Sequence, residues 1–185
     1  MLTLSLMKSD DIWRGAAAGA LGGVIGSAAM VCFNHALSAA GVGRDDRGRR
    51  KQDRRAHAEP NETDGTIPDE PASEKSVSNL VETMTGASLG DRGKKVGGSL
   101  AHHAFGATLG AVYGAAAARF PRIAAGGGLP YGAFVWLTAT EAGVPLAGLS
   151  KHPAEYPLER HASSLATHLV FGLTVERVRS WIARR

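Results

Sequence analysis

Glycine at every fourth position, inside long stretches that carry almost no charge, is the feature that most restricts how this chain can fold. The repeat occurs near the N-terminus and again in the second half, at Gly15, Gly19 and Gly23 and at Gly106, Gly110 and Gly114. Residues four apart lie on one face of an α-helix, so each repeat predicts a helix with a face of nearly bare backbone. A second helix can approach such a face closely, as helices commonly do in lipid.

Four apolar stretches are long enough to cross a bilayer. They cover residues 13–37, 99–120, 123–149 and 161–182. A helix needs about 20 residues to cross about 30 Å of hydrocarbon at 1.5 Å per residue. Pro145 interrupts the third stretch, because it lacks the amide that would bond to the Glu141 carbonyl. We therefore predict an all-α fold, an integral membrane bundle of four helices with glycine stripes.

Composition supports lipid rather than water as the surroundings. Glycine accounts for 24 of the 185 residues and aromatic residues for only 6%, whereas a water-soluble core needs large side chains. The net charge of +4 fits basic flanks of membrane helices, and no helix-turn-helix or aromatic-interleaved basic motif accompanies it. We expect the lipid bilayer as a partner and no nucleic acid. Cys32 is the single cysteine, which excludes an intramolecular disulfide.

The charge pattern divides the chain into three segments. Residues 1–42 hold the N-terminus and the first predicted transmembrane helix, residues 43–98 form a charged segment, and residues 99–185 hold three further transmembrane helices. The charged segment has a basic block and then an acidic block, a pattern typical of a disordered loop. Contact of the basic block with anionic headgroups is the alternative. Helical spacing of apolar residues predicts a short amphipathic helix near 77–85.

The start of the chain has two further features. Asp10 and Asp11 precede the first apolar stretch, which argues against a cleaved signal peptide with its basic leader. Met1 and Met7 are both candidates for the initiator. Residues 15–23, GAAAGALGG, also resemble the glycine-rich turn of a dinucleotide-binding fold, but no β-branched strand precedes them, so we favour the membrane helix.

Short motifs in the second half carry a family resemblance. They are His102-His103-Ala104-Phe105-Gly106, Leu109-Gly110-Ala111-Val112-Tyr113-Gly114, Tyr131-Gly132 with Trp136 and Glu141, Tyr156-Pro157, His168-Leu169-Val170-Phe171-Gly172, and Thr174-Val175-Glu176-Arg177-Val178-Arg179. Together they resemble the YagU-like family of bacterial inner-membrane proteins, over the last half of the chain and the first apolar stretch. The resemblance implies a multi-pass helical bundle in the bacterial inner membrane. It implies no catalytic residue, because the family's molecular function is uncharacterised.

Ionisable side chains inside the apolar stretches form a candidate intramembrane polar cluster. Its members are His102, His103, Glu141, His168 and Glu176. A charged side chain at the bilayer centre costs about 2.5 kcal/mol or more, so these residues require a reason. Glu141 and His168 are of the types that relay protons, which suggests proton- or ion-linked transport or sensing. The structural alternative, which we favour at this stage, is a packing contact worth about 0.6 kcal/mol.

Metal binding and catalysis find little support. His161 and His168 on the fourth stretch are about 10 Å apart along a helix, and the adjacent His102 and His103 point about 100° apart. Ser163 and Ser164 lack a visible acid partner or strand-to-helix turn. We therefore expect no metal, no cofactor and no enzyme. The sequence favours a structural or interaction bundle, whose glycine faces pack within the chain or against a second copy or another membrane protein.

Overall fold

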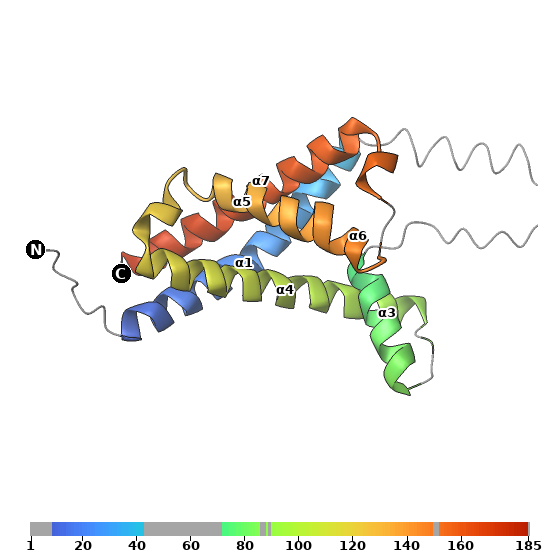
Figure 1. Cartoon of the computed structure of the whole chain (residues 1–185), viewed down its shortest axis with the longest axis horizontal. Helices are drawn as coiled ribbons and strands as arrows, with labels where there is room; N and C mark the ends of the chain where they lie inside the picture. Colours follow the sequence, from blue (N-terminus) through green and yellow to red (C-terminus); the bar gives the residue numbers. More distant parts are fainter. Residues whose placement is uncertain (1–8, 43–71, 86–87, 89, 150–151, 185) are drawn as a thin grey trace, which may run out of the picture.

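The computed structural model describes residues 9–42, 72–85, 88, 90–149 and 152–184. This part of the chain is 88% helical and contains no strand, which confirms the predicted all-α class. The long helices are α1 (Ser9–Ala39), α4 (Asp91–Arg119) and α7 (Leu158–Ala183). Figure 1 shows them running side by side, with the beginning of α1 and the end of α7 at the same end of the molecule. Of the predicted charged loop at 43–98, residues 43–71 lie outside the described residues.

Helix α1 lies between α4 and α7 and runs antiparallel to both. Gly15, Gly19 and Gly23 face Gly114, Gly110 and Gly106 of α4 in that order. The other side of α1 meets α7, where Gly22 contacts Val175 and Gly26 contacts Phe171. Two helices therefore approach α1 on faces that lack large side chains, as the fourfold spacing predicts for packing within one chain.

The third predicted stretch, 123–149, is not a single helix. It consists of the 3₁₀ turn η1 (Pro121–Ala124), helix α5 (Leu129–Val135), the π-helix η2 (Trp136–Gly143) and the short α6 (Val144–Leu146). Gly126, Gly127 and Gly128 all have positive φ, so they turn the chain before α5 in a conformation that other residues rarely adopt. Helix α5 packs on α7 through Gly128 against Gly172 and Gly132 against His168.

The π-helix has a local cause. The amide of Val144 bonds to the carbonyl of Ala139, five residues earlier, so the turn is wider than an α-helical one. Pro145 follows directly and cannot donate to the Glu141 carbonyl. The wider register accommodates the proline within a continuous segment from α5 to α6. It also sets the direction of Glu141, which lies inside η2.

Helix α3 (Ala72–Thr85) lies across the beginning of α4. It is longer than the short helix expected near 77–85, and α4 begins at Asp91 instead of at residue 99. Gly97 and Gly98 of α4 allow the contact, because a Cβ at either position would press on Val77 or Glu74. The two glycines thus hold α3 at one end of the bundle, beside the connection between α6 and α7.

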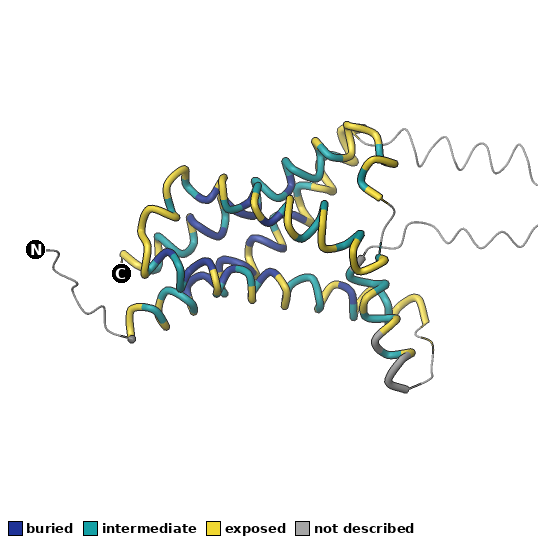
Figure 2. The backbone as a smooth tube through the Cα atoms, viewed as in Figure 1, coloured by how far each residue is buried: buried dark blue, intermediate teal, exposed yellow. Residues whose placement is uncertain are grey.

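The buried core is small. Figure 2 shows buried residues along the facing sides of α1, α4, α5 and α7, and exposed residues on their outer sides. The largest fully buried side chains are Phe171, Val175 and Ser27. By length and composition, α1 is the one helix among the described residues that is apolar enough to cross a membrane; the candidate span is Asp10–Ala39, and an 18-residue window within it has a mean hydropathy of 1.8. That single helix is weak support for a membrane protein, so the predicted membrane bundle stays a prediction at this point.

Candidate functional site

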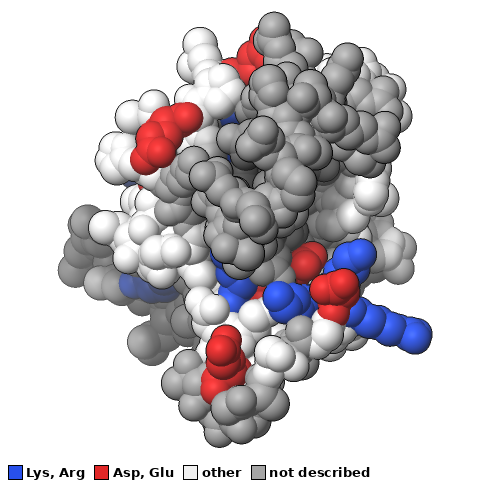
Figure 3. Space-filling view, turned by 90° about the vertical axis from the view of Figure 1, so that its right-hand side faces the viewer, with Lys and Arg blue, Asp and Glu red and all other residues white. Residues whose placement is uncertain are grey.

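A half-open cavity of about 1030 Å³ lies between α4 and the α5–η2–α6 segment. Its inner wall is apolar and comes from α1, α4, α5 and α7: Met30, Leu109, Val135 and Phe171. Its polar lining comes from α3, α4, η2 and α7: Lys75, His102, Glu141, Arg160, His161 and His168. We call this space the bundle cavity. Figure 3 views the molecule from the end where α3 lies, and Lys and Arg side chains gather on that face beside Asp and Glu.

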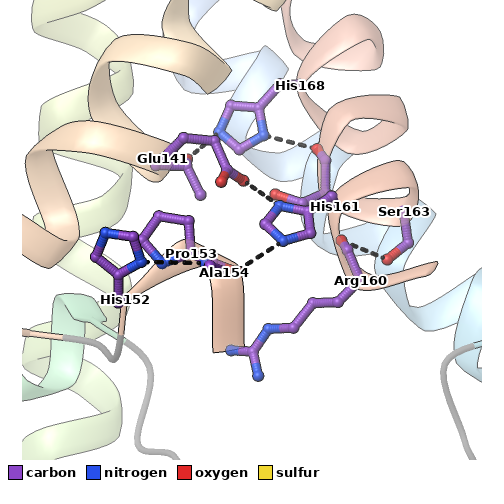
Figure 4. Close-up of polar contacts among 10 residues, drawn as sticks. Glu141, His152, Pro153, Ala154, Arg160, His161, Ser163 and His168 are labelled. Carbon is purple, nitrogen blue, oxygen red and sulfur yellow. Dashed lines mark hydrogen bonds and ion pairs between the residues drawn. The ribbon is translucent and has the colours of Figure 1, made fainter. Parts of the chain in front are cut away.

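Glu141 and His161 form the central polar contact of the bundle cavity (Figure 4). The Glu141 Oε1 atom lies 2.9 Å from Nδ1 of His161, and the other ring nitrogen, Nε2, lies 3.0 Å from the carbonyl oxygen of Pro153. The side chains are 16% and 22% exposed, respectively, so water reaches the pair only partly. The contact joins η2 to α7 and to the short η3 turn (Pro153–Glu155) that precedes α7.

These two contacts restrict the protons of the pair. Both ring nitrogens of His161 face oxygen atoms, and a carbonyl oxygen only accepts, so Nε2 carries a proton. A second proton lies between Nδ1 and Glu141, either as an imidazolium beside a carboxylate or as a carboxylic acid beside a neutral ring. The hydrogen bond to Glu141, assisted by the Pro153 carbonyl, raises the pKa of His161 above its usual value. The pair is thus built to hold one exchangeable proton.

His168 lies deeper in the same cavity, two helical turns further along α7. Its Nδ1 lies 2.8 Å from the Ser164 carbonyl, so this nitrogen donates a proton to that oxygen. Its Nε2 lies 3.0 Å from the Thr140 hydroxyl, which donates to the ring when the ring is neutral. Thr140 and Glu141 are neighbours in η2, so consecutive residues of the π-helix contact the two histidines of α7.

The structure pairs Glu141 with His161 and not with His168, the partner suggested by the sequence. The reason is the register of α5 on α7. Gly128 faces Gly172 and Gly132 faces His168, so the two helices run antiparallel. Glu141 comes nine residues after Gly132, and it therefore lies beside the part of α7 that precedes His168 by about as many residues. This register brings Glu141 close to His161. No sequence pattern shows it, because it depends on which glycines meet.

Of the other predicted polar residues, only His102 joins the cavity. The His103 ring lies edge-on to that of His102, with centroids 5.7 Å apart, and its Nδ1 contacts the Ser99 carbonyl of its own helix. Glu176 lies apart, toward the other end of α7. No group of three or more His, Cys, Asp or Glu side chains in the described ranges has a geometry suited to a metal ion.

Glu176 belongs to a separate, closed cluster. Arg179 donates two hydrogen bonds of 2.7 Å to its carboxylate, and the Tyr113 hydroxyl donates a third of 2.9 Å. Tyr113 in turn stacks on Tyr131 with ring centroids 4.2 Å apart. The carboxylate is neutralised and its oxygens are bonded, which is the arrangement that keeps a buried charge stable. This cluster is therefore structural, and it links α4 to α7.

Three features of the cavity carry no obvious signal in the sequence. Lys75 reaches it from α3 and donates a 3.2 Å hydrogen bond to the Leu149 carbonyl. His161 is one turn inside the start of α7 and contacts the preceding loop. Ser27 lies on the cavity wall, and its hydroxyl is buried with no hydrogen-bond partner in the described part of the chain. A buried hydroxyl left unbonded costs about 1–3 kcal/mol, so water or a ligand in the cavity is its natural partner.

A family comparison covers the residues that build this site. The family described as "Protein of unknown function (DUF1440)" matches residues 78–177, more than half of the chain. The chain belongs to the DUF1440 family. No curated protein and no solved structure matches it.

The DUF1440 match includes five of the six polar residues named for the bundle cavity: His102, Glu141, Arg160, His161 and His168. Helix α1, which supplies Ser27 and Met30, lies before the matched segment, as does Lys75. The family description names no activity.

Proposed function

We propose that this DUF1440 protein is a multi-pass protein of the bacterial inner membrane, and that its bundle cavity serves proton- or ion-linked transport or sensing. The observation that carries the functional part is the Glu141–His161 pair. It shares one exchangeable proton at the opening of a cavity that continues inward to His168, His102 and Ser27. The resemblance to the YagU-like family of bacterial inner-membrane proteins supports this membrane location.

The distribution of large apolar side chains supports the membrane placement. The faces between helices carry Gly, Ala and Ser, whereas many large aliphatic and aromatic residues point outward. On α1 and α4 the exposed ones include Leu21, Val24, Ile25, Val31, Leu100, Phe105 and Val112, and on the α5–η2 segment they include Phe134 and Leu137. A soluble bundle buries such residues, and contiguous exposed apolar surface marks a membrane or protein interface. In hydrocarbon the same surface has no unfavourable contact with water.

The placement of charges supports the same conclusion. Residues 15–39 of α1 and 96–118 of α4 contain no Asp, Glu, Lys or Arg. The carboxylate of Glu176, inside the bundle, is held by Arg179 and Tyr113. Glu141 and His161 lie at the end of the bundle beside η3, outside the hydrocarbon in this proposal. Charges that cannot reach water are thus paired, as membrane interiors require.

Cys32 offers a direct test of the membrane placement. It is exposed on the outer side of α1, and in a bilayer that side faces lipid, which a water-soluble reagent does not enter. We expect a water-soluble maleimide to leave Cys32 unlabelled in native membranes and to label it after unfolding in SDS. The matched control is Asp10→Cys in a Cys32→Ser background, at the end of α1, which is labelled in both conditions. Rapid labelling of Cys32 in the folded protein would contradict the placement.

The proton-linked function is tested by flux. Purified protein in liposomes containing a pH-sensitive dye is given a membrane potential, and the rate of internal pH change is measured. Glu141→Gln replaces the carboxylate that faces His161 with an amide that cannot exchange a proton with the ring, so the protein-dependent rate falls at least tenfold. Glu159→Gln is the matched control, because it is the same change on an exposed turn of α7. Equal rates for wild type and Glu141→Gln would exclude the proton-linked role.

A purely structural bundle is the second candidate. The closed Glu176–Arg179–Tyr113 cluster favours it, because that contact fixes helices without exposing a titrating group. Self-association through the glycine faces has less support, because the stripes of α1 and α4 are already used against one another. A structural bundle predicts that Glu141→Gln leaves proton flux unchanged while stability falls.

A further inference from the structure

We propose that the bundle cavity binds a single-chain anionic amphiphile, with its carboxylate or phosphate head at Lys75 and Arg160 and its hydrocarbon chain between α4 and α5. The inference rests on the membrane placement proposed above, because lipid is the source of such molecules. It does not rest on proton flux, so the two can fail separately. Three properties of the cavity carry it: its division into an apolar and a basic part, its charge balance, and the position of α3.

The cavity is divided along its length. The inner part is lined mainly by apolar side chains, among them Leu109, Val135 and Phe171 from three helices, and its polar members are Ser27, His102 and His168. Val135 and Phe171 are in the buried core. The outer part is lined by Lys75 and Arg160. The volume of about 1030 Å³ is at the upper end of the range of about 300–1,000 Å³ typical of small-molecule pockets. A molecule with one charged end and one apolar end matches this division, whereas a small inorganic ion leaves the apolar part unfilled.

The charge balance selects an anion. Among the described residues that line the cavity, Glu141 is the one carboxylate, and His161 lies 2.9 Å from it. Lys75 adds a positive charge at the opening, and Arg160 also lines the cavity. The ammonium group of Lys75 has three N–H donors, and one of them donates a hydrogen bond to the Leu149 carbonyl. Arg160 stacks on the Tyr156 ring at 3.9 Å, which fixes its guanidinium beside η3, and Figure 4 shows that side chain extending away from Glu141.

Helix α3 places the ammonium group at the opening. It is fixed on α4 by the contacts of Glu74 and Val77 with Gly98 and Gly97, on either side of Lys75 in the sequence. The Lys75–Leu149 bond then connects α3 to the chain just beyond α6. The helix therefore spans the two walls of the cavity and holds a cation between them.

The test is native mass spectrometry of the full chain, released from neutral detergent after addition of one of three twelve-carbon probes. The probes are dodecanoate, dodecyl phosphate and dodecyltrimethylammonium. We expect one equivalent of an anionic probe to remain bound and the cationic probe to be lost. The relative affinities of the first two distinguish a carboxylate from a phosphate head.

Variants locate the site. Lys75→Gln weakens binding of the anionic probe at least tenfold, Lys75→Arg restores it, and Arg122→Gln, at the opposite end of the bundle, leaves it unchanged. Ala139→Phe, which fills the inner part, blocks binding without altering any charge, and its circular dichroism spectrum shows whether it is folded. Retention of the cationic probe as tightly as the anions, or equal binding by Lys75→Gln and wild type, overturns the proposal. If Glu141→Gln loses proton flux but the wild-type protein binds no probe, the transport proposal is supported and the amphiphile proposal is wrong.

Discussion

Gly19 of α1 and Gly110 of α4 lie so close that a Cβ atom on either one would overlap the carbonyl oxygen of the other. The same contact recurs one turn away on both sides, at Gly15 with Gly114 and at Gly23 with Gly106. The two stripes therefore form one continuous backbone-to-backbone interface. Because the overlap is with backbone atoms, no side-chain rotation relieves it, and the helices have to move apart to accept a methyl group.

Gly110→Ala is consequently expected to lower the free energy of unfolding by about 2 kcal/mol or more, within the range for an overpacked core. The measurement is the thermal unfolding midpoint in detergent, followed by circular dichroism. Gly90→Ala is the matched control, because Gly90 has ordinary φ of −68° and nothing within 4 Å of its Cβ position. Gly110→Leu unfolds the chain instead of dissociating an oligomer. A folded monomer from a wild-type dimer would show that the stripe serves assembly.

The Glu176–Arg179 pair yields a second prediction. Arg179→Met leaves the Glu176 carboxylate buried without its main partner, so it destabilises the protein by about 3–5 kcal/mol. Arg177→Met changes an exposed neighbour and shifts stability by about 0.5 kcal/mol or less. The double variant Glu176→Met with Arg179→Met recovers most of the loss, because no unpaired charge remains. Denaturant unfolding in mixed micelles measures all three, and a double variant as unstable as Arg179→Met would show that packing, not charge, dominates.

The sequence predicted the helices and their close approach because both follow from local patterns. Fourfold glycine spacing places Gly19 and Gly110 on bare faces whatever the partner, and the charge-free stretches set the helical regions. The ends of the helices are harder to predict from the sequence. The sequence placed the start of this helix at residue 99, after the charged segment 43–98, yet α4 begins at Asp91, where α3 packs on Gly97 and Gly98. Tertiary contact overrides low helix propensity there.

The site was predicted only in part for a different reason. Glu141 and His168 were recognised from their charge in apolar stretches, and the structure does place both in one cavity. The actual partner of Glu141, His161, depends on the register of α5 on α7 and on the π-helix, neither of which is a local property. Pro145 was the available signal. It indicated a broken helix, but a wider turn that keeps the segment continuous was not predicted.

The Glu141–His161 contact predicts a pH dependence of stability. The pKa of His161 in the folded protein is raised from 6.5, chiefly by the hydrogen bond to Glu141. A raised pKa means that the contact contributes fully below the unfolded value of 6.5, and that this contribution is lost as pH rises through the folded pKa. The unfolding midpoint therefore decreases from pH 6 upward across that window. His161→Gln flattens the curve, whereas His35→Gln, on the exposed side of α1, preserves it.

Pro145→Ala tests what sets the direction of Glu141. The substitution supplies an amide at position 145 that can bond to the Glu141 carbonyl, so the segment can adopt ordinary α-helical register in place of the wider π turn. Changing the register rotates Glu141 away from His161 while leaving both side chains present. We expect Pro145→Ala to flatten the pH dependence of the unfolding midpoint as His161→Gln does.

The control for this change is Pro157→Ala, at the exposed N-terminal cap of α7, which keeps the wild-type pH dependence. The overall helix content by circular dichroism stays the same in both variants, because each removes only a proline. Proton flux through liposomes provides the second readout, and it falls in Pro145→Ala as it does in Glu141→Gln. If Pro145→Ala instead retains both the wild-type flux and the wild-type pH dependence, the glycine register of α5 on α7 alone is sufficient to hold Glu141 at His161.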